Sequence, residues 1–292
     1  MYYVFIIGGS QNMNDLVVKH NALTNASYSL SLAEQRLILL AIVDARCSGH
    51  GVTTNDPLTI TAKAYENQFS VHRNTAYQAL KDASSNLFDR RFSYQELNKR
   101  GSIENVRSRW VSEIRYVDDE ASVKLIFAPA VVPLITELER HFTQYELGQV
   151  AGLSSAYSVR LYELLISWRS IGKTPIFELE EFRNKLGVID GEYKLMHQFK
   201  QRVLDLAISQ INEHTDINAS YEQHKHGRTI TGFSFKFKLK TPEPKLPKQE
   251  KPKQNATHTK LQEEKEKAAD LAHLKKMAEL AGIPLETLLK RP

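Results

Sequence analysis

The sequence predicts an α+β fold with two tandem helix-turn-helix modules, each followed by a β-hairpin, in a chain of 292 residues. The first observation is the order of elements over residues 31–129, which is helix, strand, two helices and then a strand meander. The second observation is that the same order recurs over residues 154–240. A duplicated module is a stronger indication than either copy alone. The order is that of a winged helix, in which a β-hairpin wing follows the helix-turn-helix.

The first module is expected to begin with a helix at residues 31–46. Ser31 is its predicted cap, and Glu34 stands three residues later, as in a capping box. A short strand and two helices follow, at residues 56–61, 62–71 and 72–88. Three strands come next, with the sequences RFSYQEL, NVRSRWVSEIRYV and ASVKLIFAP, separated by turns at residues 99–101 and 118–119.

The second module repeats the pattern with a helix at 154–170, a strand at 174–179, helices at 180–188 and 192–215, and a hairpin at 219–240. In the last strand Phe233, Phe235 and Phe237 alternate with serine and lysine, so one face is aromatic and the other basic. We expect the aromatic face to pack the hairpin on its helices. The stretch FSYQE at 92–96 echoes ASYEQ at 219–223, and each is expected to open the hairpin of its module.

These patterns divide the chain into four parts, which are an N-terminal extension at 1–14, winged-helix domain 1 at 15–140, winged-helix domain 2 at 141–241 and a tail at 242–292. In the tail, prolines alternate with lysine and glutamate, which predicts a Pro/Lys-rich linker, and a charged C-terminal helix follows at 260–281. Met13 opens a stretch typical of a natural start, so residues 1–12 are interpreted as a read-in extension.

The composition favours a polyanionic partner and a cytoplasmic location. The formal net charge is +5 and the sequence pI is about 9.0, a mildly basic balance that suits nucleic acid. The single cysteine, Cys47, excludes an internal disulfide framework and fits a reducing cytoplasm. No apolar run approaches the ~20 residues of a membrane helix, so no membrane partner is expected.

The outward faces of two helices carry side chains suited to reading DNA, because an α-helix fits the major groove and its N-terminal residues reach base edges. In the helix at 72–88, the residues expected to face DNA are Arg73, Asn74, Tyr77, Gln78 and Lys81. In the helix at 192–215 they are Lys194, His197, Gln198 and Gln201, with Lys200 and Arg202 on the flanks, toward phosphates. The apolar face of this second helix is expected to consist of Met196, Phe199, Val203, Leu206 and Ala207.

Basic residues also mark both predicted wings. Those of the first are Lys99, Arg100, Arg107 and Arg109, and residues 70–116 hold nine Lys and Arg against five Asp and Glu, a local +4. Those of the second are His224, Lys225, His226 and Arg228, at a turn for which Gly227 is suited. We expect both wings to contact the sugar-phosphate backbone. The alternative is an ordinary surface hairpin whose lysines serve solubility.

Four stretches carry a resemblance to a known family, namely VVKHNALTNASYSLSLAEQRLILLAI, FAPAVVPLI, GLSSAYSVRLYELL and QINEHTDINASYEQHKHGRTITGFSFKFK. Over residues 15–240 the chain resembles the plasmid replication initiator (Rep) proteins that bind iterons through two tandem winged helices. It is similar in particular to the initiators of small plasmids from Acinetobacter-type bacteria and of related circular DNAs recovered from cattle products.

The resemblance implies that monomers bind direct repeats, the iterons, in double-stranded origin DNA, with the second winged helix supplying most of the sequence readout. It implies that homodimers joined through domain 1 act as autorepressors at an operator inverted repeat. It further implies recruitment of the host replication initiator and the replicative helicase. The family's main recognition helix corresponds to residues 192–215. Within domain 1, RLILLAIV at 36–43 is apolar and β-prone and ASVKLIFAP is a candidate edge strand, which also favours a dimer.

Two other interpretations have less support. A rolling-circle nuclease would use a His-hydrophobic-His pair, but His224-Lys225-His226 has lysine at its centre and no tyrosine follows it. The sequence has no zinc-ligand spacing and no phosphate-cradling Gly-Lys-Ser/Thr loop. We therefore expect no catalytic residues, no metal, no cofactor and no enzymatic activity. A winged-helix transcriptional repressor without an initiator role is the main alternative.

Overall fold

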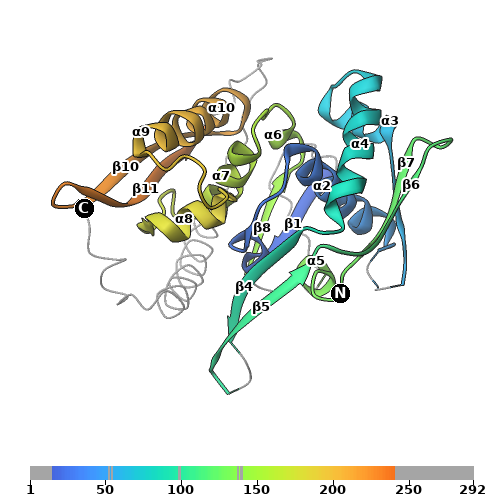
Figure 1. Cartoon of the computed structure of the whole chain (residues 1–292), viewed down its shortest axis with the longest axis horizontal. Coiled ribbons are helices and arrows are strands. Elements are labelled where there is room, and N and C mark those ends of the chain that lie inside the picture. Colours follow the sequence, from blue (N-terminus) through green and yellow to red (C-terminus); the bar gives the residue numbers. More distant parts are fainter. Residues whose placement is uncertain are drawn as a thin grey trace, which may run out of the picture.

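The computed structural model describes residues 15–51, 53, 55–97, 100–136, 138 and 141–240. The elements of domain 2 lie on the left and those of domain 1 on the right of Figure 1. The N-terminal extension at 1–14, the side chain of Lys99 and the expected linker and helix at 242–292 lie outside the described residues. No helix within the described ranges is long and apolar enough to cross a membrane.

The first module has the predicted winged-helix order. Its helices are α2 (Leu32–Ser48), α3 (Ala62–Phe69) and α4 (Arg73–Leu87), and its strands are β3 (Leu58–Thr61), β6 (Val111–Val117) and β7 (Ser122–Phe127). The strands form a sheet in the order β3-β7-β6. The capping box is confirmed, since Ser31 Oγ accepts from the N–H of Glu34, and the Glu34 carboxylate accepts from the N–H of Ser31.

A second hairpin stands between α4 and β6. It consists of β4 (Arg91–Leu97) and β5 (Ile103–Arg109), and β4 also pairs with β2 (Ser27–Tyr28), in a sheet separate from that of the winged helix. The single strand expected over NVRSRWVSEIRYV is wrong, because the chain breaks at Trp110. This side chain is buried, and its ring centroid lies 4.9 Å from that of Tyr28 and 4.9 Å from that of Phe92. Packing of Trp110 thus separates the two sheets.

The second module follows the same plan. Its helices are α7 (Ala156–Ile166), α8 (Leu179–Leu186) and a long helix made of α9 (Met196–Phe199), a π-helical turn η2 (Lys200–Asp205) and α10 (Leu206–His214). Its strands are β9 (Phe177–Glu178), β10 (Ile217–His226) and β11 (Thr229–Leu239), in the order β10-β11-β9. The alternation of the last strand is confirmed, because Phe233, Phe235 and Phe237 are buried.

The two sheet orders identify which hairpins correspond. The order β6-β7-β3 in the first module matches β10-β11-β9 in the second, so the wing of domain 1 is the β6–β7 hairpin. The prediction that Arg100, Arg107 and Arg109 lie on the wing of domain 1 was therefore wrong, because they belong to the inserted β4–β5 hairpin. In the sequence, Lys99 falls between β4 and β5. For the same reason FSYQE and ASYEQ do not open equivalent hairpins.

The π-helical turn alters the apolar face of the long helix. Phe199, Val203 and Ala207 are buried as expected, but Leu204 is 0% exposed and Leu206 is 41% exposed. The expectation that Leu206 lies in the core was wrong, because a π turn holds more residues than an α turn and rotates the residues after it about the helix axis. Leu204 fills the core position in place of Leu206.

The modules meet across a small sheet of β1 (Leu16–His20) and β8 (Phe142–Glu146), near the short helices α1 (Asn21–Thr24), α5 (Val132–Thr136) and α6 (Gly148–Ala151). Arg160 of α7 crosses between the modules, and its guanidinium donates to the carbonyl oxygens of Thr24 at 3.1 Å and Ala26 at 2.9 Å. A Cβ on Gly187, at φ +80, would stand 2.5 Å from the carbonyl oxygen of Tyr28. The buried apolar residues of both modules form one continuous core.

The apolar stretch and strand that favoured a dimer are both internal. Most of the RLILLAIV stretch, residues 37–43 of α2, is buried in the core. β7, the main part of ASVKLIFAP, lies between β3 and β6, so its expected place at an edge was wrong. The two three-stranded sheets described in domain 1 have β2 and β5, and β3 and β6, at their edges.

Candidate nucleic-acid interface

The long helix of the second module presents most of the residues predicted to face DNA. On the helix, His197, Gln201 and Arg202 are exposed and Gln198 and Lys200 are half-buried. Lys194 is also exposed, but it lies in the turn before the helix, which begins at Met196 and not at 192 as predicted. Lys200 lies on the flank nearest the wing, because its Nζ donates to Gln223 Oε1 of β10 at 3.2 Å. The outward stripe therefore offers amide and imidazole groups, which can bond base edges, with cations beside them.

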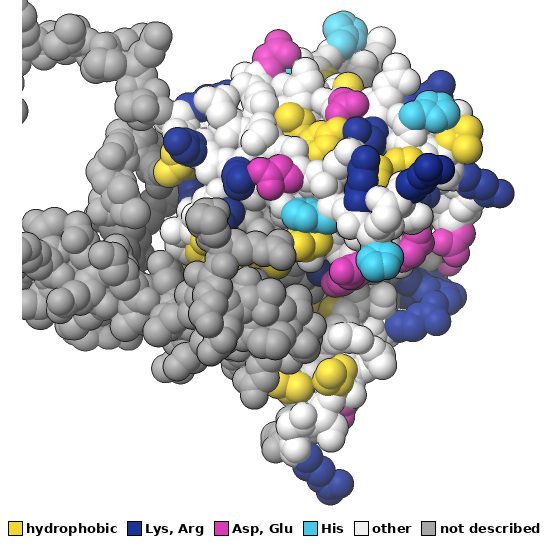
Figure 2. All heavy atoms as spheres, turned by 90° about the vertical axis from the view of Figure 1, so that its left-hand side faces the viewer, with side chains coloured by type: hydrophobic (Ala, Val, Ile, Leu, Met, Phe, Trp, Pro, Cys, Tyr) yellow, Lys and Arg dark blue, Asp and Glu magenta, His cyan; other side chains and the backbone are white. Residues whose placement is uncertain are grey.

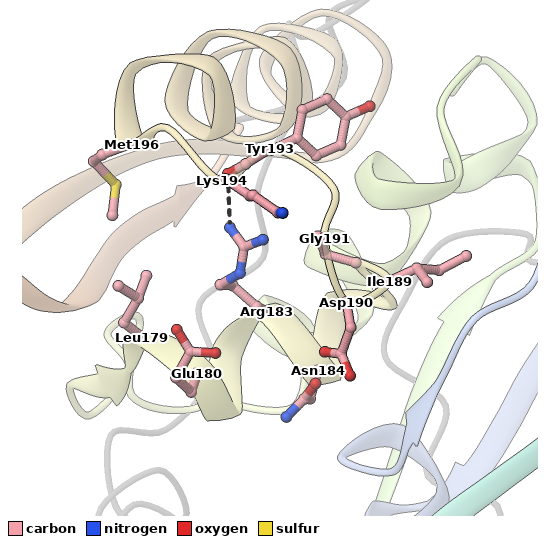
Figure 3. A pocket seen from close by; sticks show the side chains of 11 residues that line it. Leu179, Glu180, Arg183, Asn184, Ile189, Asp190, Gly191, Tyr193, Lys194 and Met196 are labelled. Carbon is pink, nitrogen blue, oxygen red and sulfur yellow. Dashed lines mark hydrogen bonds between the residues drawn. The ribbon is translucent and has the colours of Figure 1, made fainter.

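Packing fixes both this helix and the turn before it. Phe199 is buried with its ring centroid 6.1 Å from that of Phe233 in the wing. Arg183 of α8 lies 4.9 Å from the Phe199 ring and donates to the carbonyl oxygens of Glu192 at 2.6 Å and Tyr193 at 3.3 Å. Figure 3 shows this guanidinium beneath the start of the helix. Arg183 thus holds the turn that positions the N-terminal side chains.

A cavity of about 240 Å³ opens between α8 and the same turn (Figure 3). Its charged lining combines Arg183 and Lys194 with Glu180 and Asp190. The acids offset the cations, so the cavity does not offer the uniformly basic surface that a phosphate prefers.

The wing of the second module carries an exposed basic tip. Lys225, His226 and Arg228 are exposed around Gly227, whose φ of +61 suits the turn. Figure 2 shows the face on the left of Figure 1, where Lys, Arg and His side chains lie interspersed with acidic ones. Just below the tip, His224 Nε2 lies 2.7 Å from Ser234 Oγ across the strands.

Lys236 of β11, and Lys240 directly after this strand, have partners within the module. Lys236 pairs with Glu222 at 2.6 Å, and Lys240 Nζ donates to the carbonyl oxygen of Asn212 at 2.6 Å. The Glu222 carboxylate has its pKa held below the usual range by the hydrogen bond and charge of Lys236. These lysines add less to the field of the wing than the exposed tip does.

The first module arranges its candidate helix differently. On α4, Arg73, Asn74, Gln78 and Lys81 are exposed and Tyr77 is half-buried. The Tyr77 hydroxyl donates to Asp118 Oδ1 at 2.8 Å, and Lys81 Nζ donates to the same oxygen at 3.3 Å. Hydrogen bonds from these two groups lower the pKa of Asp118. Gln78 is also engaged, donating to Asp82 Oδ1 at 2.7 Å.

The inserted β4–β5 hairpin holds the remaining basic candidates. Arg100 and Arg107 are exposed, whereas Arg109 donates to the carbonyl oxygen of Phe88 at 2.6 Å and to Asp89 at 3.0 Å. Leu97 and Ile103 face each other in the register near its end and are 44% and 55% exposed. The hairpin projects downward from the body in Figure 1. It combines exposed cations with an apolar end.

Two side chains that contact the candidate interface were not predicted from the sequence, namely Asp118 and Arg183. Asp118 was expected only as part of a turn, and its contact with α4 depends on β6–β7 folding over that helix. Arg183 lies in a predicted helix, and no local pattern signals that it reaches the carbonyl oxygens nine and ten residues later. The double acid Asp118-Asp119 at a wing turn was the one available signal that the two wings differ in charge.

His224 and His226 do not form a metal centre with other groups in the described structure. His224 contacts Ser234, and among the described residues no cluster of three or more His, Cys, Asp or Glu could hold a metal ion. The geometry of this surface is that of a binding face built from helices and hairpins.

Comparisons with known proteins agree with this architecture. The family model described as "Initiator Replication protein, WH1" matches residues 16–166, and the model "Initiator Rep protein, WH2" matches residues 178–237. An Escherichia coli "Replication initiation protein" is 24% identical over 233 residues, which cover 78% of this chain and 71% of the relative.

Two solved structures are also similar. The Pi initiator protein in complex with iteron DNA is 24% identical, with a TM-score of 0.60, over 79% of this chain and 99% of the other. This likeness supports the tandem winged-helix fold. The WH1 domain of MSBI1.176, a replication protein isolated from a multiple sclerosis patient, is 63% identical over 38% of this chain and 81% of the other, with a TM-score of 0.32.

Proposed function

The chain belongs to the initiator Rep protein family, and from that premise we propose that it starts plasmid replication by binding direct repeats, or iterons, sequence-specifically at an origin. The observation that carries the proposal is the second module, where a helix with outward amides is followed by a wing with a basic tip. The Pi initiator protein, whose fold is similar, has been solved in complex with iteron DNA, which supports DNA of this kind as the ligand.

We assign different tasks to the helix and the wing of domain 2. Gln198, Gln201 and His197 would meet base edges in the major groove, because amides and imidazole distinguish base pairs there. Lys225, His226 and Arg228 would lie on the sugar-phosphate backbone, where cations release counterions and add affinity without sequence information. Lys194, Lys200 and Arg202 would contact flanking phosphates.

Domain 1 would add further contacts to the same DNA. Its candidates on α4 are Arg73, Asn74, Tyr77, Gln78 and Lys81, and those on the inserted hairpin are Lys99, Arg100, Arg107 and Arg109. Among the described candidates, Tyr77, Gln78, Lys81 and Arg109 contact acidic side chains in the structure. Their contribution to affinity would therefore be smaller than that of the exposed tip of the second wing.

We propose a homodimer through domain 1 that represses at an operator inverted repeat. This placement is supported by the exposed apolar pair of Leu97, at the end of β4, and Ile103, at the start of the edge strand β5, on a projecting hairpin. At the origin, the monomer would recruit the host replication initiator and helicase. The protein would act by binding alone, without catalysis.

Two assays test the proposal. Fluorescence anisotropy with duplexes carrying the direct repeats beside its gene should give at least ~10³-fold tighter binding than scrambled duplexes. Equal affinity for both would overturn sequence-specific binding. A marker plasmid whose only origin is the repeat region should replicate when the chain is supplied. If it represses a reporter but never supports replication, the chain is a winged-helix transcriptional repressor without an initiator role.

A further inference from the structure

The wing turns of the two modules differ in charge. The second turn is basic, with Lys225, His226 and Arg228, whereas the first carries Asp118, Asp119 and Glu120. Glu120 is paired with Lys124 on its own hairpin at 3.3 Å. Asp118 instead reaches across to α4, the helix that corresponds in order to the DNA-facing helix of the second module.

Two side chains of α4 donate to one carboxylate oxygen of the wing turn. Tyr77 and Lys81 lie four residues apart on α4 and therefore share a face. Both donate to Asp118 Oδ1, the hydroxyl at 2.8 Å and the ammonium at 3.3 Å. Tyr116 of β6 completes the setting, because Lys81 Nζ lies 5.6 Å from its ring centroid and 5.9 Å from that of Tyr77.

This arrangement is suited to an anionic oxygen in general. A phenol hydroxyl and an ammonium aimed at one oxygen are donors that proteins use on DNA phosphates. The two tyrosine rings, which meet edge to face at 5.7 Å, restrict where the Lys81 ammonium lies. The carboxylate of Asp118 is an anion and accepts both of these hydrogen bonds, as a phosphodiester oxygen would.

The contact is also replaceable. The Lys81 and Asp118 side chains are 48% and 64% exposed, and an exposed ion pair of this kind is weak and screened by salt. Asp118 lies in the turn between β6 and β7, outside the paired residues, so rotation of its side chain away from Lys81 breaks no strand pairing.

We propose that Tyr77 and Lys81 form a binding site for a backbone phosphate of DNA, and that Asp118 occupies this site in the unbound protein and so limits the DNA affinity of domain 1. The inference deepens the proposed function, on which it rests. It assigns Tyr77 and Lys81 to the backbone and leaves base contacts to the second module. The wing turn of domain 1 then competes with a DNA phosphate for Tyr77 and Lys81, whereas the wing of domain 2 binds the DNA backbone.

The test compares two charge-matched variants of the full chain. Asp118→Ala opens the site, whereas Asp119→Ala removes the same charge one residue away and leaves Asp118 in place. Binding is measured by anisotropy on repeat and scrambled duplexes over a range of salt concentrations. Asp118→Ala should bind both duplexes about five- to tenfold more tightly at 0.1 M salt, with a salt slope steeper by about 0.9, the effect of one added phosphate contact. Asp119→Ala should keep the wild-type slope.

A second pair of variants shows whether Lys81 receives the phosphate. Lys81→Ala should cost more affinity in the Asp118→Ala background than in the wild type, where Asp118 competes for it. Tyr77→Phe removes only the hydroxyl, and it should reduce the gain in DNA affinity that Asp118→Ala produces. Thermal unfolding of each variant checks that the fold is retained.

Two results would overturn the inference. One is an equal gain from Asp118→Ala and Asp119→Ala, which would indicate a general charge effect. The other is an equal cost of Lys81→Ala in both backgrounds. If the chain binds scrambled and repeat duplexes equally, the proposed function fails, yet the Asp118 effect is still readable, because phosphate contacts carry no sequence information. Absence of binding to either duplex defeats both.

Discussion

Lys19 of β1 and Glu163 of α7 form an ion pair at the junction of the two modules, with only 2% and 1% of their side chains exposed. Arg160 pairs with the same carboxylate at 2.8 Å, and the Tyr145 hydroxyl also donates to it. Every partner of Glu163 is thus buried with it, and the group links the β1–β8 sheet to the first helix of the second module.

Removing Glu163 should destabilise the protein strongly. Glu163→Ala leaves Lys19 and Arg160 buried beside each other without their shared anion, and breaking such a pair costs about 3–5 kcal/mol of unfolding free energy. Denaturant unfolding measures this difference. The control is Glu66→Ala, which breaks the Lys63–Glu66 pair, whose side chains are 70% and 26% exposed, and should change stability by at most about 0.5 kcal/mol. Equal effects of the two substitutions would contradict the role of the buried cluster.

The same carboxylate should make stability depend on acid. Burial opposes ionisation of Glu163, but the charges of Lys19 and Arg160 and the hydrogen bonds outweigh it, so its pKa lies below the ordinary 4.5. Below pH 4.5 the unfolded chain takes up this proton first, so stability falls as the pH drops through the lowered pKa. Between about pH 6 and about pH 3, the free energy of unfolding should decline less in Glu163→Gln than in the wild type. Parallel declines would show that Glu163 has no such role.

The π-helical turn predicts opposite sensitivities for two nearby leucines. Leu204→Ala creates a cavity in the core and should cost about 2–5 kcal/mol, whereas Leu206→Ala removes a side chain that is 41% exposed and should cost under about 1 kcal/mol. The two variants are matched in chemistry and lie on one helix, so helix propensity cancels. Chemical denaturation measures the free energy of unfolding of both variants. A larger loss of stability in Leu206→Ala than in Leu204→Ala would mean that the helix is regular.

These leucines also show where sequence reasoning reached its limit. The capping box at Ser31 and the alternation of Phe233, Phe235 and Phe237 are local patterns, and both were predicted correctly. The exchange of Leu204 for Leu206 was not, because a regular 3.6-residue period cannot reveal a π turn. The break at Trp110 depends on packing against Tyr28, 82 positions earlier in the chain, and local propensity cannot predict such a contact.

The candidate interface likewise has features that the sequence predicts and a contact that it does not. Exposure of Gln201, Arg202 and the basic tip follows from amphipathic and alternating patterns, and the structure has them exposed. The engagement of Tyr77 and Lys81 by Asp118 is a contact between elements about 40 residues apart, which only the folded sheet brings together. The sequence therefore predicted which side chains point outward, but not which of them are bonded to an acidic side chain of the same protein.

Removal of the tail should leave DNA binding nearly unchanged. The described basic candidates all precede residue 240, so a chain ending at Lys240 should bind the repeat duplex within about threefold of the full chain. Anisotropy at one salt concentration measures this, with the Lys225→Ala/Arg228→Ala variant of the full chain as the positive control for lost affinity. A tenfold or greater loss on truncation would assign a DNA-binding or docking role to residues 241–292.

Gln201 and Lys225 should affect DNA binding in different ways. Gln201 projects from the exposed side of the long helix, and if it bonds a base edge, Gln201→Ala should cost about 1–3 kcal/mol on the repeat duplex and almost nothing on a scrambled one. Lys225 lies at the exposed wing tip, so Lys225→Ala should weaken both complexes alike and reduce the salt slope by about 1. Salt titrations of both variants on both duplexes separate the two effects. If Lys225→Ala weakened only the repeat complex, or Gln201→Ala weakened both equally, the assignment of base contacts to the helix and backbone contacts to the wing would be wrong.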